Sequence, residues 1–136
     1  MRSHASGPLI LIVDDNEDSR AMYACSFTNE GCRVAEAAHG FQGLDRAFKM
    51  HPDAILMDLR MPALDGWETI RLLRNRACTR HIPIIALTGD TDLEHLKLAK
   101  NAGCDVVLLK PCSPDAVLGQ IWRLLAEHSP DLWART

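Results

Sequence analysis

Five short apolar runs divide the chain, and polar residues follow directly after most of them. The runs cover residues 9–13, 34–37, 54–57, 82–87 and 106–109. Continuous aliphatic runs of this length are typical of parallel strands that are covered on both faces. Pro83 stands near the start of the fourth run, where a missing N–H group is tolerated. The pattern therefore predicts five buried strands.

Helical spacing of apolar residues follows each of these runs. It predicts helices over about residues 18–29, 40–50, 65–76 and 91–102, and a last helix that begins at residue 114. Polar side chains stand at the expected N-cap positions, namely Asn16, Asp65, Thr91 and Ser113. Gly103 stands where a left-handed residue ends a helix. The alternation predicts an α/β fold of the (βα)5 type, a doubly wound parallel five-stranded sheet with the flavodoxin-like order 2-1-3-4-5.

Four of the predicted strands end in residues that carry chemistry. Strand one is followed by Asp14 and Asp15, strand three by Asp58, strand four by Thr88 and strand five by Lys110. The carboxyl ends of parallel strands share one edge of the sheet, so these side chains should meet there. Three carboxylates would repel one another unless a cation lay between them, and oxygen ligands suit Mg²⁺. A lysine and a hydroxyl group beside them suit a phosphoryl group on Asp58.

Composition and charge argue against nucleic-acid-binding, zinc-binding and membrane-spanning proteins. A chain of 136 residues fits one domain, and its net charge of −3 gives no general attraction to nucleic acid. The five cysteines show no zinc-ligand spacing and favour reduced thiols in a cytosol. No apolar run approaches the roughly 20 residues of a membrane span. We therefore expect a soluble cytoplasmic protein that binds neither membrane nor nucleic acid. A basic cluster is interpreted as a solvated face; it comprises Arg71, Arg74, Arg76, Arg80 and His81.

The ordered set of motifs resembles the receiver domain of two-component response regulators, of the single-domain chemotaxis type. The resemblance covers residues 9–127, leaving an N-terminal tail over residues 1–8 and a C-terminal tail over residues 128–136. The matching motifs are Val13-Asp14-Asp15-Asn16, Met57-Asp58-Leu59-Arg60-Met61-Pro62 with Asp65-Gly66, Leu87-Thr88-Gly89, Ala102-Gly103 before Asp105, and Leu109-Lys110-Pro111.

The resemblance implies a role for each strand-end residue. Asp58 is the phosphoacceptor, Thr88 senses the phosphoryl group and Lys110 pairs with it. Asp14, Asp15 and Asp58 hold Mg²⁺ together with the backbone carbonyl of Arg60. The donor is a histidine kinase or a histidine phosphotransfer protein, and the output goes to a protein target through the fourth helix, fifth strand and last helix. The chain is then a switch and not an enzyme that turns over a substrate, and it acts as a monomer or as a phosphorylation-dependent dimer.

One residue departs from the family pattern. Receiver domains commonly carry Tyr or Phe three residues before the lysine, and here that position is Val107. The alternative function is a receiver-like interaction module that is not phosphorylated. An aspartyl-phosphate hydrolase is disfavoured because Arg60 stands where a second catalytic acid belongs. A flavin-binding relative is disfavoured because Asp14 and Asp15 would repel a phosphate.

Overall fold

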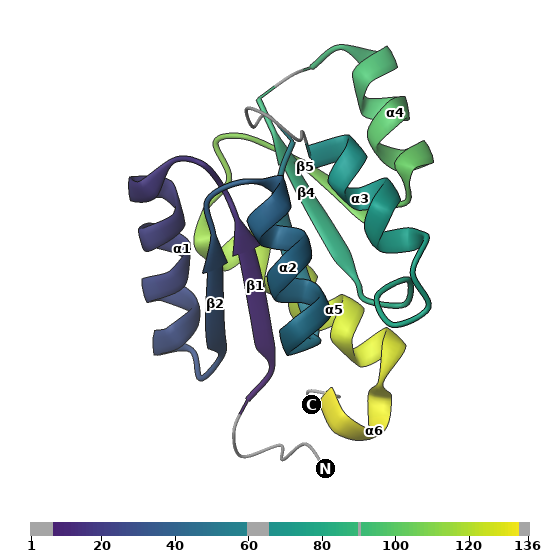
Figure 1. Ribbon diagram of the computed structural model, residues 1–136. Coiled ribbons are helices and arrows are strands. Elements are labelled where there is room, and N and C mark those ends of the chain that lie inside the picture. The colour runs from purple at the N-terminus through teal and green to yellow at the C-terminus, as the bar shows by residue number, and fades with distance from the viewer. Residues whose placement is uncertain (1–6, 60–65, 90, 134–136) are drawn as a thin grey trace.

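A single parallel sheet forms the centre of the molecule, with helices on both of its faces (Figure 1). The computed structural model describes residues 7–59, 66–89 and 91–133. The strands lie in the order β2-β1-β3-β4-β5 and every pair is parallel, as predicted. Their bounds are β1 (Leu9–Val13), β2 (Arg33–Ala37), β3 (Ala54–Asp58), β4 (Ile84–Thr88) and β5 (Val106–Leu109).

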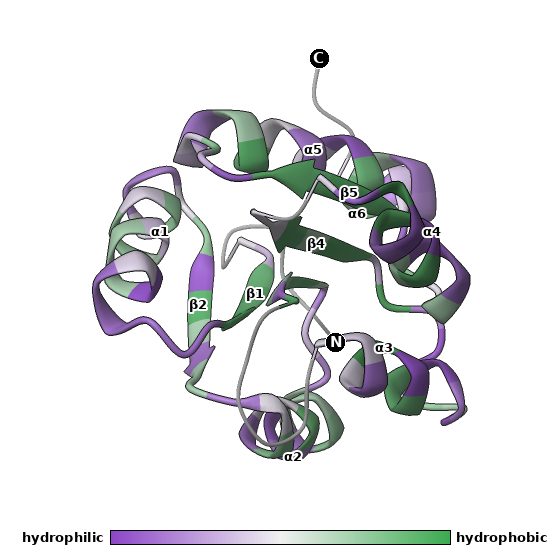
Figure 2. Ribbon diagram, turned by 90° about the horizontal axis from the view of Figure 1, so that it is seen from above, coloured by the Kyte–Doolittle hydropathy of each residue, from purple (hydrophilic) through white to green (hydrophobic). Residues whose placement is uncertain are grey.

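The helices form two layers, which are seen along the strands in Figure 2. Helices α1 and α5 cover one face of the sheet, and helices α2, α3 and α4 cover the other. The bounds are α1 (Glu17–Asn29), α2 (Gly40–Met50), α3 (Gly66–Arg74), α4 (Leu93–Ala102), α5 (Pro114–His128) and α6 (Pro130–Trp133). Among the described residues, no helix combines the length and the apolar character that crossing a membrane requires.

Burial on both faces explains why the strands are apolar throughout. In β1, Leu11 and Val13 pack on the side of α2, while Ile10 and Ile12 pack on the side of α1 and α5. All five residues of β1, of β3 and of β4 are buried. The two edge strands are more exposed, and β2 accordingly shows the weaker apolar pattern. The three central strands therefore give the site a rigid base.

Side-chain caps begin most of the helices. Asn16 Oδ1 accepts a hydrogen bond from Ser19 N at 2.8 Å, and Ser113 Oγ accepts one from Ala116 N at 3.2 Å, as predicted. Gly103 ends α4 with a φ of 116°, also as predicted. The prediction of Thr91 as the cap of α4 is wrong. The cap is Asp92, whose carboxylate accepts from Glu94 N at 2.8 Å, so the helix begins at Leu93.

Three further segments add to or differ from the sequence prediction. Strand β4 begins at Ile84 and not at residue 82, because Pro83 contributes only its carbonyl group, which accepts from Ile55 N at 2.9 Å. The cap predicted at Asp65 lies outside the described residues. The segment expected as a C-terminal tail includes the helix α6, whose Trp133 is buried with its ring centroid 6.5 Å from that of Trp122.

Candidate functional site

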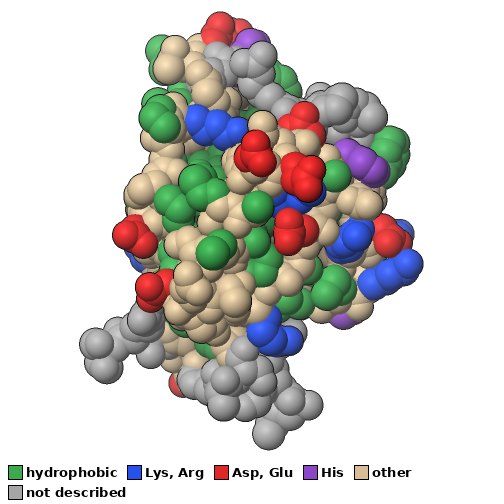
Figure 3. Space-filling model, turned by 90° about the vertical axis from the view of Figure 1, so that its left-hand side faces the viewer, with side chains coloured by type: hydrophobic (Ala, Val, Ile, Leu, Met, Phe, Trp, Pro, Cys, Tyr) green, Lys and Arg blue, Asp and Glu red, His purple; other side chains and the backbone are tan. Residues whose placement is uncertain are grey.

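Strands β1 and β3 bring three carboxylates together at the carboxyl edge of the sheet. The register pairs Val13 with Met57, so Asp14 and Asp58 follow on neighbouring strands. The ligand atoms of Asp14, Asp15 and Asp58 all lie within 4.8 Å of one another. Asp14 is 2% exposed and Asp58 is 5% exposed, whereas Asp15 is open to solvent. Figure 3 shows acidic side chains gathered in the upper half of one side of the molecule, toward the end where these strands finish.

Backbone and side-chain hydrogen bonds hold Asp14 in place. Its amide donates to Ala37 O at 3.0 Å, and its Oδ1 accepts from Asn16 N at 2.9 Å. Its carbonyl oxygen accepts from Arg20 Nη1 at 2.7 Å, and Arg20 Nε also pairs with Glu36 Oε1 at 3.0 Å. Asp14 is therefore oriented before any ligand arrives, which lowers the cost of binding one.

Lys110 supplies a positive charge to the same edge. Its Nζ lies 3.3 Å from Asp58 Oδ2, and its amide donates to Thr88 O at 2.8 Å. The peptide bond between Lys110 and Pro111 is cis. The ammonium group can therefore neutralise charge that develops on, or is added to, the Asp58 carboxylate.

Gly66 at the start of α3 lies tightly against the backbone of the strand that carries Asp58. A Cβ atom at this position would lie 2.6 Å from Leu59 Cα and 2.7 Å from Asp58 O. Leu59 N in turn donates to Leu87 O at 3.0 Å, which ties the end of β3 to β4. The glycine of the Asp65-Gly66 motif thus lets the helix approach the acidic strand closely.

Of the remaining residues considered in the sequence, two lie within the described part of the chain and two lie outside it. Thr88 is the last residue of β4 and is 3% exposed, on the strand beside the one that carries Asp58. Val107 is half-buried in β5 and packs against the core on the side of α2, α3 and α4. Arg60 and Asp90 lie outside the described residues, so the predicted carbonyl ligand of Arg60 stays a prediction.

The donor set fits a hard divalent cation. Carboxylate oxygens are the ligands that Mg²⁺ prefers, and Mg²⁺ usually takes one or two carboxylates and completes its shell with water and phosphate. Within residues 7–59, 66–89 and 91–133, this is the one group of three or more potential ligands whose atoms lie this close together. The arrangement can therefore hold a cation beside the oxygen atoms of Asp58.

Two residues near the site were not singled out from the sequence. Arg20 fixes the Asp14 carbonyl, and the Tyr23 hydroxyl donates to Cys112 O at 2.7 Å across the space between α1 and the loop after β5. Burial raises the pKa of Tyr23 above 10.0, and the nearby Cys112, Asp14 and Asp58 raise it further. Helical spacing places both residues on α1, but it does not show which partner a side chain reaches across the fold.

Comparison with known proteins gives one consistent result. A family model described as the response regulator receiver domain matches residues 10–122. Protein PilG of Pseudomonas aeruginosa is 31% identical over 130 residues, which is 96% of either chain. Several other curated relatives are longer proteins, and the chain spans only 16% to 52% of their length.

Solved structures agree with the sequence comparison. The chemotaxis protein CheY4 of Vibrio cholerae superposes with a TM-score of 0.82 at 30% identity, over 87% of this chain and 98% of that one. The receiver domain of the sensor histidine kinase PA1611 from Pseudomonas aeruginosa has a TM-score of 0.82 at 32% identity, over 88% and 98%. That structure holds a magnesium ion coordinated in its active-site cleft.

Proposed function

Since the chain belongs to the response regulator receiver domain family, we propose that Asp58 accepts a phosphoryl group and so acts as the input of a signalling switch. The observation that carries the proposal is the ion pair of 3.3 Å between Lys110 Nζ and the buried Asp58, inside a cluster of three carboxylates. A buried carboxylate with a cation on one side and further acids on the other suits transfer of a doubly charged group.

The proposed reaction is an in-line displacement. An oxygen of Asp58 attacks the phosphorus of a phosphohistidine on the partner, the P–N bond breaks, and a mixed anhydride forms on Asp58. The leaving imidazole keeps the electron pair of the broken bond. Lys110 then pairs with an oxygen of the transferred group. Mg²⁺, held by Asp14, Asp15, Asp58 and the Arg60 carbonyl, would neutralise further negative charge at this site.

Readout is proposed to begin at Thr88. A phosphoryl oxygen on Asp58 can accept a hydrogen bond from the Thr88 hydroxyl and draw the end of β4 inward. Helix α4 starts at Leu93, shortly after Thr88, so this movement would reach it first. Because Val107 replaces the usual aromatic residue, the signal would run through this loop and α4.

The proposed partners follow from the same role. The donor is a histidine kinase or a histidine phosphotransfer protein, and the target binds the face formed by α4, β5 and α5. Three large apolar side chains of α4 and β5 are exposed, namely Leu93, Leu98 and Leu109. The chain would work in the cytoplasm, as a monomer or a phosphorylation-dependent dimer. Any catalysis would be limited to its own phosphorylation and dephosphorylation.

Incubation with acetyl phosphate and Mg²⁺ tests the proposal. We expect a phosphorylated species by intact-protein mass spectrometry or phosphate-affinity electrophoresis, absent in Asp58→Asn and retained in Asp53→Asn, which alters an aspartate before the same strand. If no donor, including a panel of histidine kinases, phosphorylates the folded wild-type protein, the receiver-like interaction module becomes the better account.

A further inference from the structure

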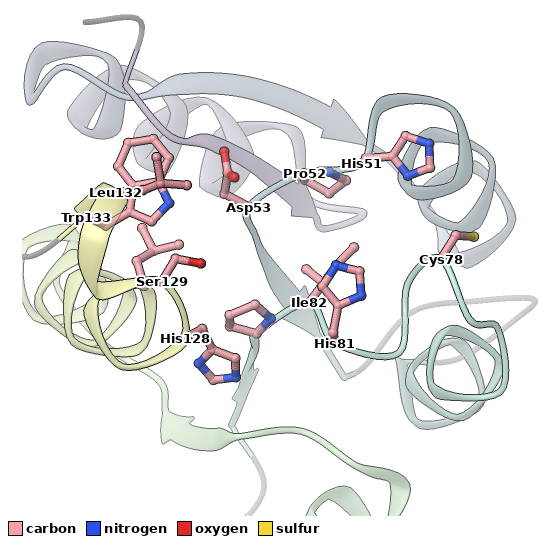
Figure 4. A pocket seen from close by; sticks show the side chains of 12 residues that line it. His51, Pro52, Asp53, Cys78, His81, Ile82, His128, Ser129, Leu132 and Trp133 are labelled. Carbon is pink, nitrogen blue, oxygen red and sulfur yellow. The ribbon is translucent and has the colours of Figure 1, made fainter. Parts of the chain in front are cut away.

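A pocket of about 420 Å³ lies at the edge of the sheet where the strands begin, opposite the acidic site. It is formed by the segment before β3, the segment before β4, the end of α5, and α6 (Figure 4). Its volume lies within the range of known sites for small molecules. Neither the acidic cluster nor Lys110 lines this pocket. The proposed phosphorylation of Asp58 therefore gives the pocket no role.

Apolar side chains form much of the pocket lining. Ile82 and Leu125 are each 2% exposed and Trp133 is 5% exposed, so these side chains are fixed by packing. The Trp133 ring also contacts that of Trp122. Leu132, which is 37% exposed, adds apolar surface that is open to the hollow. A preformed pocket of this kind can receive the body of a small molecule without reorganising the fold.

Three imidazoles surround this apolar lining. His51 follows α2, His81 lies between α3 and β4, and His128 ends α5, and all three are exposed. In Figure 4, His51 and His81 lie on one side of the hollow, while His128 and Ser129 lie near the other. Half of the six histidines of the chain therefore line one pocket.

The hydrogen bond of His128 fixes the orientation of its ring. Its Nδ1 lies 2.9 Å from Leu124 O, and because a carbonyl only accepts, Nδ1 must carry the hydrogen. When the ring is protonated, Nε2–H is left to donate to a ligand. The other titratable groups that line the pocket are His51, Asp53, Cys78 and His81.

The spacing of these groups favours an extended ligand over a metal ion. Among the described residues, only the acidic cluster brings three potential metal ligands within 4.8 Å of one another. Asp53, the acidic side chain of the pocket, already accepts from Leu9 N at 2.7 Å. We propose that this pocket binds a small organic anion with an apolar body, such as an aryl carboxylate, whose carboxylate pairs with His128 and His81 while its ring lies against Leu132 and the exposed edge of Trp133.

Titration of the folded chain with sodium benzoate tests this proposal, using benzamide as the neutral counterpart. By NMR we expect saturable shifts of the Trp133 indole signal, with a dissociation constant on the order of 1 mM. His128→Gln and His81→Gln should each weaken benzoate binding by about tenfold. His95→Gln on α4, outside the pocket, should leave it unchanged.

Three results would overturn the proposal. They are no saturable benzoate binding, equal binding of benzamide, or benzoate binding that both pocket variants retain. A parallel titration with zinc chloride covers the metal alternative, because zinc binding that the pocket variants lose, without benzoate binding, would assign the histidines to a metal. All variants should still be phosphorylated on Asp58 if that function holds, so failure of either proposal is seen separately.

Discussion

Asp15 is the member of the acidic cluster whose role can be isolated most cleanly. It is open to solvent, whereas Asp14 and Asp58 are buried, so replacing it should alter the cation site without disturbing the core. We expect Asp15→Asn to weaken Mg²⁺ binding by about tenfold or more, because it removes the charge of one of three carboxylates. Calorimetry or tryptophan fluorescence of the folded protein measures this.

Asp18→Asn provides the matched control for this prediction. It makes the same change of charge on an exposed residue in the first turn of α1, outside the cluster. Mg²⁺ affinity should stay within about twofold of wild type, because Asp18 contributes no ligand atom to the cluster and exposed charges interact weakly through water. Equal losses in both variants would mean that net charge, and not ligation by Asp15, governs the binding.

At the scale of elements, Arg74 connects the base of β4 to the end of α4. The sequence pattern places Arg74 on a solvated basic face, but its side chain is only 19% exposed. Its guanidinium donates at 2.6–2.9 Å to Gly103 O, Arg80 O, Ile82 O and Asp105 Oδ2. Burial lowers the pKa of Arg74, and the neighbouring Asp105 opposes that shift. The charge is therefore held by its partners and not by solvent.

Arg74→Ala should lower the free energy of unfolding by about 2–4 kcal/mol, because it removes the cationic partner of Asp105, which keeps the hydrogen bond from Ile84 N, and the donor to several carbonyl groups. Urea denaturation measures the change. Arg71→Ala is the control, since the Arg71 side chain forms an exposed pair with Glu68 and its loss should cost about 0.5 kcal/mol or less. Similar small losses of unfolding free energy in the two variants would mean that Arg74 contributes no more to stability than an exposed arginine.

Two glycines, one within α5 and one at the C-terminal cap of α4, should respond to alanine with opposite signs. Gly119 lies exposed within α5, and an added Cβ would meet nothing within 4 Å, so Gly119→Ala should stabilise the protein by about 0.5–1 kcal/mol. Gly103→Ala should destabilise it, because φ is 116° and the Cβ would lie 2.8 Å from Arg74 Cγ. Thermal denaturation gives both signs, and a stabilising Gly103→Ala would contradict the argument.

Local features of the fold could be predicted from the sequence, whereas contacts between distant segments could not. Apolar runs and strand-end motifs predict the five strands and where Asp58 stands, because both depend on residues that are close in the chain. The contacts of Arg74 could not be predicted in the same way, since Gly103 and Asp105 lie about 30 residues away. The cap of α4 was misplaced by one residue because Thr91 and Asp92 are both good caps and local geometry decides between them.

For the molecule as a whole, the sheet separates two regions of different chemistry. The carboxyl edge holds the acids and Lys110, and the opposite edge holds the pocket with three histidines. The core between them comprises two apolar clusters, one on each face of the sheet. A ligand in the histidine pocket therefore would not compete with a phosphoryl group for the same space.

The buried hydroxyl group of Tyr23 makes the free energy of unfolding depend on pH. It is the single tyrosine of the chain, so tyrosinate absorbance reports it directly. Its pKa is raised above 10.0, chiefly by burial, which means that the folded state holds the hydroxyl proton more tightly than the unfolded chain. The resulting stabilisation is fully present below about pH 10 and is lost as pH rises through the folded-state pKa.

We therefore expect the absorbance midpoint of Tyr23 to lie at higher pH in the folded protein than in denaturant. Tyr23→Phe removes the hydrogen bond to Cys112 O and should lower the free energy of unfolding by about 1 kcal/mol near neutral pH. Because the variant has no hydroxyl to ionise, its stability should fall less steeply than that of wild type above about pH 10. Parallel curves for the two proteins, or a midpoint unchanged by unfolding, would show that the buried hydroxyl does not couple folding to pH.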